Sequence, residues 1–342
     1  MSIAIDFGFE FLRTKPYKVL LCTVVNAFFL LCSGASCLAQ DPPAEPIKHQ
    51  LNASNEPKVG LVLGGGGARG AAHVGVLKIL EQEGIRIDCI TGVNIGAVVG
   101  GLYSAGVSIS YLEEMFTKKS LMRSYLTVPV SVRVLALPVF LIPRLMGKRG
   151  YDGLYKGNHF RNYLNRYVPQ SESDISDSKI PFGAVALNLV DGKITTLRTG
   201  NLGTALQASS AIPLLRKPVK INNGLYVDGG VTNNLPVAEA KAMGADIVIA
   251  VDLDDPGKAP EEAELMKLGT VSHRVVVLHL ANVDKEQCKL ANVLIRPELA
   301  DIGLMSESSK DAHTAELAGE RAALEALPAI KKALKEAGIA TP

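Results

Sequence analysis

Apolar and polar positions follow two periods along the chain, and their order predicts parallel strands joined by helices. The short apolar run Lys58–Leu63 stops at Gly64–Gly67, which favours a buried strand. Apolar residues at helical spacing follow in Ala71–Glu83, and Ile87–Ile90 and Ala97–Ala105 continue as strand and helix. This alternation is typical of a mainly parallel sheet with helices on both faces, so we expect an α/β fold of three layers, α/β/α.

The later pattern extends this sheet. Pro181–Val190 and Lys193–Arg198 are joined by an Asp-Gly turn, which predicts a β-hairpin. Ile247–Leu253 and Val275–Leu280 are short apolar runs, and we interpret both as further strands.

The C-terminal part of the chain is expected to be helical. Ala312–Ala337 is rich in Ala, Glu, Lys and Leu, which predicts a helix broken at Pro328. We therefore expect a core domain over residues 57–255, with strands and a helical tail over residues 256–342 packed on that core.

Residues 1–39 have the pattern of an export signal. Basic residues precede the apolar run Val19–Leu31, which is too short to span a bilayer comfortably, and small residues follow up to Ala39. We expect cleavage after Ala39 and a flexible, polar leader over residues 40–56, with an uncleaved signal anchor as the alternative. The chain is accordingly expected to be exported to the periplasm or the medium, or to stay at the membrane if the anchor is kept.

Composition and charge argue against several classes of function. Lys plus Arg number 36 against 34 Asp plus Glu, a net charge of +2, which argues against nucleic acid as a partner. No pair of histidines has ligand spacing, so no metal site is predicted, and His73 is expected to be a helix or loop partner.

Cys89 and Cys288 lie beyond the signal. Cys89 stands in an apolar stretch, so we expect a buried thiol and no disulfide.

One segment differs from the rest of the chain. Between Glu114 and Asp152 there is no acidic residue, while seven Lys and Arg residues interrupt a strongly apolar stretch. Isolated cations among apolar side chains suit an interface with anionic lipid, so residues 118–149 are expected to contact a lipid or membrane surface. The alternative is a pair of helices that cover the core.

A glycine-rich loop follows the first predicted strand. Gly64–Gly70 contains the spacing G-x-G-x-x-G, and backbone N–H groups at a helix start favour an anion or a developing oxyanion. A dinucleotide site would need an acidic residue at the end of the second strand, but Asp88 lies inside that strand. A phosphate-binding P-loop is excluded because two alanines follow the loop, in place of Lys and Ser or Thr. No nucleotide is therefore predicted.

Two further motifs stand at strand ends. Gly92-Val93-Asn94-Ile95-Gly96, between a strand and a helix, has the shape of a nucleophile elbow, in which a tight turn exposes the central side chain. That side chain is Asn94 and not Ser. Leu225–Gly230 is an apolar strand that ends in Asp228 and two glycines, and its carboxylate could be a general base, a metal ligand or a turn former.

Together these motifs resemble the patatin-like phospholipase family. Further matching stretches, in the same order, are Pro181–Ala186, Ala208–Pro213, Asn233–Val237 and Gly244–Asp252. The resemblance covers about residues 57–255. It implies a serine acyl hydrolase that acts on lipid esters with a Ser/Asp dyad and needs no metal or nucleotide cofactor.

The resemblance also implies roles for single residues. Asp228 matches the dyad acid that would take the proton of the nucleophile. Ser209 and Ser210 match a family motif and are assigned to substrate binding. The loop that would hold the oxyanion matches four residues here: Gly65, Gly66, Gly67 and Arg69.

Position 94 departs from the family, because the resemblance places the nucleophilic serine there. A carboxamide nitrogen shares its lone pair with the carbonyl and cannot form an ordinary acyl-enzyme, so we expect impaired ester hydrolysis. Loss of the nucleophile typically costs about 10⁶ in turnover.

Several alternatives stay open. The first is a non-catalytic, exported, lipid-binding pseudoenzyme. In the second, Ser209 or Ser210 takes over as nucleophile, and in the third, Asn94 deamidates to Asp and attacks as a carboxylate. A dinucleotide-binding enzyme is the most distant alternative.

Overall fold

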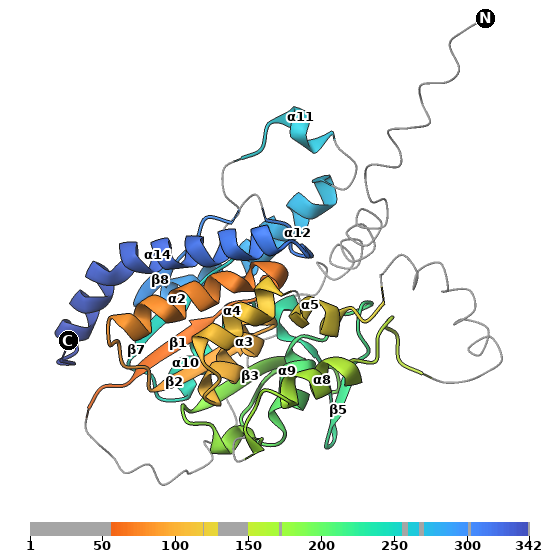
Figure 1. Ribbon diagram of the computed structural model, residues 1–342, viewed down its shortest axis with the longest axis horizontal. Coiled ribbons are helices and arrows are strands. Elements are labelled where there is room, and N and C mark those ends of the chain that lie inside the picture. The colour runs from red at the N-terminus through yellow and green to blue at the C-terminus, as the bar shows by residue number, and fades with distance from the viewer. Residues whose placement is uncertain are drawn as a thin grey trace, which may run out of the picture.

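The structure of this chain is a computed structural model, which describes residues 56–118, 120–128, 150–170, 173–254, 259–266, 270–299 and 302–340. The expected signal over 1–39, nearly all of the expected leader, and residues 129–149 of the expected lipid-contacting segment lie outside the described residues. Within the described part, an eight-stranded sheet lies between layers of helices (Figure 1). The predicted α/β/α fold with a mainly parallel central sheet is thus confirmed.

Five strands of the sheet run parallel to one another. β1 (Val59–Leu63) pairs with β2 (Cys89–Val93) and β7 (Ile247–Val251), while β2 pairs with β3 (Phe182–Asn188) and β7 with β8 (Val293–Ile295). Their continuous apolar runs are what strands covered on both faces require. The carboxyl ends of these strands lie at one edge of the sheet, where sites form in folds of this kind.

Three short strands extend the sheet in the antiparallel sense. β4 (Ile194–Leu197) and β6 (Gly224–Asp228) both pair with β3, and β5 (Val219–Ile221) pairs with β6. The β3–β4 pair is the predicted hairpin. The order of the main path is β5-β6-β3-β2-β1-β7-β8, with β4 attached to β3 alone.

The register on β3 decides where the candidate site lies. β4 pairs with Ala184–Leu187 and therefore takes one edge of β3. β2 and β6 must then share the other edge, where β2 lies beside Phe182–Val185 and β6 beside Ala186–Asn188. Because β2 is parallel to β3 and β6 is antiparallel, the carboxyl ends of β2 and β6 meet end to end.

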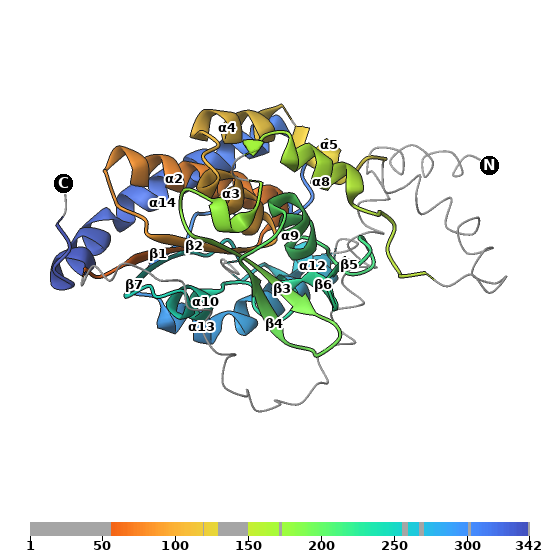
Figure 2. The ribbon, with the colours of Figure 1, turned by 90° about the horizontal axis from the view of Figure 1, so that it is seen from below.

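Helices cover both faces of the sheet (Figure 2). One face carries α2 (Ala71–Gln82), α3 (Ile95–Ser104), α4 (Ile109–Thr117), α5 (Ser120–Tyr125), α8 (Asn158–Asn165), α9 (Leu202–Ser209) and α14 (Ser309–Glu336). The other carries α10 (Val237–Ala242) and α13 (Lys285–Leu290). α11 (Glu262–Leu265) and α12 (Thr270–Val283) precede α13 in the chain. The β1 side chains alternate between two cores, since Leu61 and Leu63 pack with α2 and α3, and Val62 packs with α10.

The C-terminal helix α14 packs closely along α2. A Cβ atom at Gly75 would overlap the carbonyl oxygen of Glu316, and one at Gly319 would overlap that of Ala72. Glycine at both positions lets the two backbones approach, so the helical tail lies directly on the helix that follows the glycine-rich loop.

Two predictions of secondary structure are wrong. Val275–Leu280 is not a strand but the middle of α12, because a short apolar run fits either structure and this one continues at both ends to 14 helical residues. Pro328 does not break α14, which runs on to Glu336, since Ala323 and Ile330 on either side of Pro328 are buried in the same core.

Cys89 is buried with a free thiol, as predicted. None of the described helices is long and apolar enough to cross a membrane.

Candidate active site

Asn94 lies at a tight turn between β2 and α3. Its backbone angles are φ 53° and ψ −121°, a conformation that costs free energy for any residue with a side chain. The turn is compact enough that a Cβ at Gly92 would come within 2.6 Å of the backbone of Gly96. The Asn94 Oδ1 accepts a hydrogen bond of 2.7 Å from the N–H of Ile95, which caps α3. This is the geometry of a nucleophile elbow, with a carboxamide at its apex.

Asp228 meets Asn94 where β6 and β2 come together. The Asn94 Nδ2 donates a hydrogen bond to Asp228 Oδ2, and the N–H of Gly230 donates to Asp228 Oδ1 at 2.9 Å. Only 4% of Asp228 is exposed. Burial raises the pKa of this carboxyl to about 7, against the lowering effect of both hydrogen bonds. The structure therefore brings together the two side chains that the sequence proposed for the reactive pair.

The glycine-rich loop lies beside the elbow and presents two free backbone donors. The N–H groups of Gly64, Gly65 and Ala68 donate to carbonyls of neighbouring segments at 2.8–3.1 Å. Gly66 precedes the 3₁₀ turn η1 (Gly67–Gly70), and Gly67 begins it. Within the described part of the chain, no acceptor contacts the N–H groups of these two residues. Two adjacent free donors of this kind can hold one oxyanion.

Arg69 supports this loop from behind. Its Nε donates to Ile302 O at 2.7 Å and its Nη1 to Leu253 O at 3.4 Å, while its backbone N–H donates to Gly66 O at 3.2 Å. Only 3% of the residue is exposed, and burial lowers the pKa of the guanidinium, partly offset by the charge of Asp254. These hydrogen bonds fix the loop, so Arg69 contributes to the candidate site through the shape of the loop backbone.

The comparison with known families agrees with this geometry. The family model described as patatin-like phospholipase matches residues 61–241. The chain belongs to the patatin-like phospholipase family. The elbow, the acidic strand end and the glycine-rich loop all lie within the matched residues.

Known proteins of this type include curated relatives and solved structures. An uncharacterised NTE family protein of Mycobacterium bovis is 31% identical over 217 residues, 63% of this chain and 54% of that protein. Lysophospholipase NTE1 of Scheffersomyces stipitis is 35% identical over 210 residues, 58% of this chain and 12% of that protein. The crystal structure of VipD from Legionella pneumophila is similar with a TM-score of 0.44 and 14% identity, over 80% of this chain and 67% of that one. The chain thus spans about half the length of the mycobacterial relative.

Ser209 and Ser210 of the patatin-like motif lie behind the elbow with their hydroxyl groups bound. The Ser209 Oγ donates to Val185 O at 2.6 Å and accepts from the N–H of Asn94 at 3.1 Å. The Ser210 Oγ donates to Leu206 O at 2.7 Å. Both residues are buried, and no carboxylate of the described residues accepts a hydrogen bond from either hydroxyl. Their assignment to substrate binding stays a prediction. The bond between Ser209 and the N–H of Asn94 helps to hold the turn in place.

His73 forms a hydrogen bond with the glycine-rich loop, and the sequence predicted such a helix or loop contact. Its Nε2 lies 2.8 Å from Gly64 O, and because a carbonyl only accepts, Nε2 carries the proton. The ring is fully buried, and burial lowers the pKa of His73 to about 4 despite this hydrogen bond. The neutral ring therefore fixes the start of the glycine-rich loop at Gly64. In the described ranges, no group of three His, Cys, Asp or Glu side chains is arranged to hold a metal ion.

Asn234 is a structural residue of the site that the sequence analysis did not single out. Its carbonyl accepts the N–H of Gly65 at 3.1 Å, its own N–H donates to Asp284 at 2.8 Å, and its Nδ2 donates to Asp254. Burial raises the pKa of Asp254 to about 7 and that of Asp284 to about 8, helped in each case by neighbouring carboxylates. The sequence signal was its place in the Asn-Asn-Leu-Pro stretch, a few residues after Asp228.

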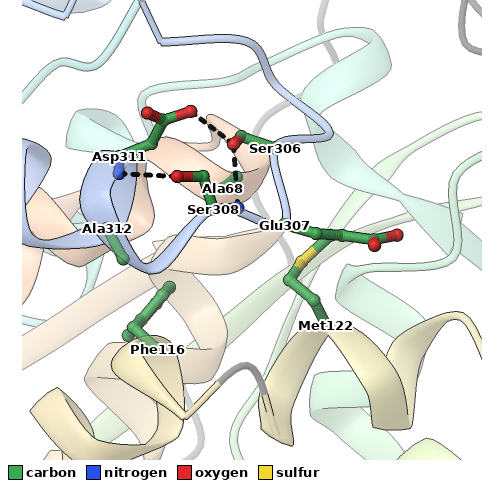
Figure 3. Close-up of a pocket in the computed structure, with 8 residues that line it drawn as sticks. All are labelled: Ala68, Phe116, Met122, Ser306, Glu307, Ser308, Asp311 and Ala312. Carbon is green, nitrogen blue, oxygen red and sulfur yellow. Dashed lines mark hydrogen bonds between the residues drawn. The ribbon is translucent and has the colours of Figure 1, made fainter. Parts of the chain in front are cut away.

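A small pocket lies beside Ala68 of the glycine-rich loop (Figure 3). Phe116 and Met122 line its apolar side, and the segment before α14 lines its polar side. There the Ser306 Oγ donates to Asp311 at 2.5 Å, and the N–H of Asp311 donates to Ser308 Oγ at 3.3 Å. These polar groups satisfy one another, and the pocket includes neither Asn94 nor Asp228.

Proposed function

We propose that this chain is an exported lipid acyl hydrolase of the patatin-like type whose turnover is impaired by Asn94. Family membership supports a phospholipid ester as the substrate, and the name of the Scheffersomyces relative, a lysophospholipase, supports a phospholipid with one acyl chain. The carrying observation is the hydrogen bond from Asn94 Nδ2 to Asp228, at a position where the family has its nucleophile.

A hydroxyl at position 94 would complete the chemistry. Asp228 would take its proton while the oxygen attacks the ester carbonyl, and the free N–H groups of Gly66 and Gly67 would stabilise the resulting oxyanion. Collapse of the tetrahedral intermediate would expel the alcohol, whose oxygen takes the proton from Asp228. Water, giving a proton to Asp228, would then hydrolyse the acyl-enzyme and restore the free hydroxyl. The lone pair of the Asn94 amide nitrogen is delocalised into its carbonyl and is a poor nucleophile. The same NH₂ group instead donates to the carboxylate that should act as base.

The test compares the wild-type chain with Asn94→Ser on a p-nitrophenyl acyl ester and on a phospholipid. Asn94→Ser is expected to raise turnover of both substrates by at least about 10³, because a nucleophile is restored to an otherwise intact site. Asn94→Ser combined with Asp228→Asn is the matched control and should lose this gain. Equal rates for wild type and Asn94→Ser would show that this turn is not the reactive centre.

Residual wild-type turnover separates the impaired hydrolase from a lipid-binding pseudoenzyme. Slow hydrolysis that Asp228→Asn abolishes supports the hydrolase, and binding of phospholipid without hydrolysis supports the pseudoenzyme. Loss of the slow rate in Ser209→Ala or Ser210→Ala would support a replacement nucleophile. Peptide mass spectrometry that finds Asp at position 94 would support deamidation.

A dinucleotide site has little support, because the Asp88 carboxylate already accepts the N–H of Val59 at 2.7 Å and pairs with Arg86.

Contact with a lipid surface is part of the same proposal, and residues 118–149 are one candidate for it. Lys118 pairs with Glu114 at 2.6 Å, and Leu121 and Tyr125 of α5 are buried in the core. The described start of the segment thus fits the covering-helix alternative, and the lipid contact there is proposed for residues 129–149 alone.

A further inference from the structure

The turn of the β3–β4 hairpin exposes two adjacent large apolar side chains. Leu189 is 48% exposed and Val190 is 68% exposed, directly after the last residue of β3. Hairpin turns in water normally carry Gly, Asn, Asp or Ser at such positions. In Figure 2 this hairpin projects from the body of the molecule, so its turn is free to meet a surface.

The backbone of this turn is bonded internally. The N–H of Leu189 donates to Leu225 O at 2.7 Å, and the N–H of Val190 donates to Asn188 Oδ1 at 3.1 Å. The N–H of Gly192 donates to Asn188 O at 2.9 Å, and Asn188 Oδ1 also accepts the N–H of Leu225 at 3.2 Å. These bonds tie the turn to the β5–β6 hairpin and hold its shape. Backbone groups that are already paired remove much of the cost of leaving water for the lipid interface.

The register places this turn at the same end of the sheet as the candidate site. Asp228 pairs with Ala186 on β3, and Val93, which precedes Asn94, pairs with Val185. Leu189 follows Ala186 by three residues, so it lies about 10 Å beyond the reactive pair at about 3.3 Å per residue. A surface that touches the turn therefore lies about 10 Å from Asp228, measured along the strand direction.

The charges around the turn favour an anionic surface. Lys193 ends the turn, and Lys220, opposite Leu225 on β5, is also exposed. Asp191 is the acidic residue of the turn, and its carboxylate accepts the N–H of Lys193 at 3.0 Å. Two lysines beside two apolar side chains form the combination that anionic lipid selects.

We propose that Leu189 and Val190 insert into the interface of an anionic lipid bilayer and hold the candidate site against it. This inference rests on the proposed function for its substrate, and it names the surface through which the chain reaches that substrate. The membrane contact proposed for Leu189 and Val190 does not depend on the separate contact proposed for residues 129–149.

The test is sedimentation of the full chain with phosphatidylcholine vesicles, with and without phosphatidylserine. The wild type is expected to bind the vesicles that contain phosphatidylserine, and Leu189→Ser/Val190→Ser should weaken this partitioning at least about tenfold. Leu317→Ser/Leu324→Ser is the matched control, since these side chains are 42% and 50% exposed on α14, and it should bind like the wild type. Lys193→Gln/Lys220→Gln should weaken binding only where phosphatidylserine is present.

Other outcomes overturn the proposal. Equal partitioning of wild type and Leu189→Ser/Val190→Ser would place the membrane contact elsewhere, and absence of wild-type binding would exclude a docking surface. Circular dichroism shows whether each variant is folded.

Kinetics in the Asn94→Ser background separate this inference from the proposed function. The hairpin variants should slow hydrolysis of vesicle phospholipid and leave hydrolysis of the soluble p-nitrophenyl ester unchanged. If Asn94→Ser hydrolyses neither substrate while Leu189→Ser/Val190→Ser still reduces vesicle binding, the proposed function fails and the docking surface stands.

Discussion

The carbonyl of Leu304 accepts a hydrogen bond of 2.8 Å from the N–H of Ala68. It also faces Gly67, whose φ of 58° and lack of Cβ let the carbonyl approach. Arg69 adds its bond to Ile302. The segment before α14 lies outside the residues matched by the family model, yet it shapes the loop that carries the free donors.

Arg69→Met is predicted to destabilise the chain by about 2–4 kcal/mol, because it leaves the buried carbonyls of Ile302 and Leu253 without their donors. The measurement is urea unfolding, with hydrogen exchange of the Ala68 amide as a local readout. Exchange at Ala68 should become faster, because the segment that accepts its hydrogen bond loses its anchor.

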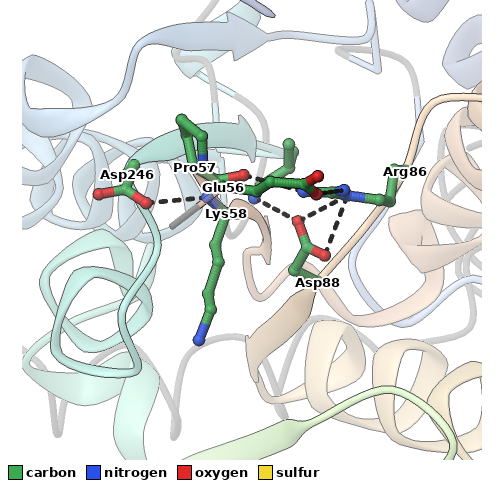
Figure 4. A network of polar contacts seen from close by, with 7 residues as sticks. Glu56, Pro57, Lys58, Arg86, Asp88 and Asp246 are labelled. Atoms are coloured by element: carbon green, nitrogen blue, oxygen red, sulfur yellow. Dashed lines mark hydrogen bonds and ion pairs between the residues drawn. The ribbon is translucent and has the colours of Figure 1, made fainter. Parts of the chain in front are cut away.

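Arg86→Met is the matched control for this prediction. Arg86 is 45% exposed and pairs with Glu56 at 3.0 Å and Asp88 at 3.1 Å (Figure 4). Its removal should cost less than about 1 kcal/mol and leave the Ala68 amide unchanged. Similar costs for the two variants would show that Arg69 does not anchor the loop.

Asn94→Gly is predicted to be more stable than Asn94→Ala by about 1–2 kcal/mol. Both variants lose the hydrogen bonds to Asp228 and Ile95, but only alanine has to adopt a φ of 53° with a side chain. Lys332 on α14 provides the control, since glycine there should be less stable than alanine by about 1 kcal/mol. The same order of stability at both positions would argue against strain at the elbow. Thermal or urea unfolding gives both differences.

Asp228→Asn is predicted to change how stability depends on pH. Burial raises the pKa of Asp228 to about 7 from an unfolded value near 3.8, so the folded state holds this proton more tightly than the unfolded state. The contribution of Asp228 to stability is therefore greatest below pH 3.8 and falls as the pH rises to about 7. As the pH rises through this range, the free energy of unfolding of Asp228→Asn should increase relative to that of the wild type, by on the order of 2–4 kcal/mol.

The control for this pH dependence is Glu325→Gln, an exposed carboxyl on α14 that should follow the wild type at every pH. The quantity compared is the change with pH, because the new amide at 228 also alters contacts with Asn94 and Gly230 at all pH values. A constant difference between Asp228→Asn and wild type from pH 4 to pH 8 would contradict the raised pKa.

Local sequence signals were enough to predict much of the core and the chemistry. Lys58–Leu63 and its glycines predicted a strand and a turn, and the Gly-x-Asn-x-Gly motif predicted the sharp turn at Asn94. These signals are local because strand ends, glycine turns and helix starts are set by neighbouring residues. The strand end at Asp228 was visible in the same way.

Long-range contacts were not predictable from those signals. Ile302 and Leu304 contact the glycine-rich loop through their backbone carbonyls. Every residue type has such a carbonyl, so the sequence near these two residues does not indicate the contact. Val275–Leu280 shows a second limit, since helix and strand bury the same short apolar run equally well. The collinear placement of β2 and β6 depends on pairing with β3, and no single segment encodes it.

The end-to-end meeting of β2 and β6 has a consequence for when the reactive pair forms. Asn94 and Asp228 are separated by 134 positions in the chain, and each reaches the other only by docking on the same edge of β3. Closing so long a loop comes late and only with the rest of the sheet in place. A nascent or partly folded polypeptide therefore carries no assembled pair, and Asn94 meets Asp228 only once the sheet is complete.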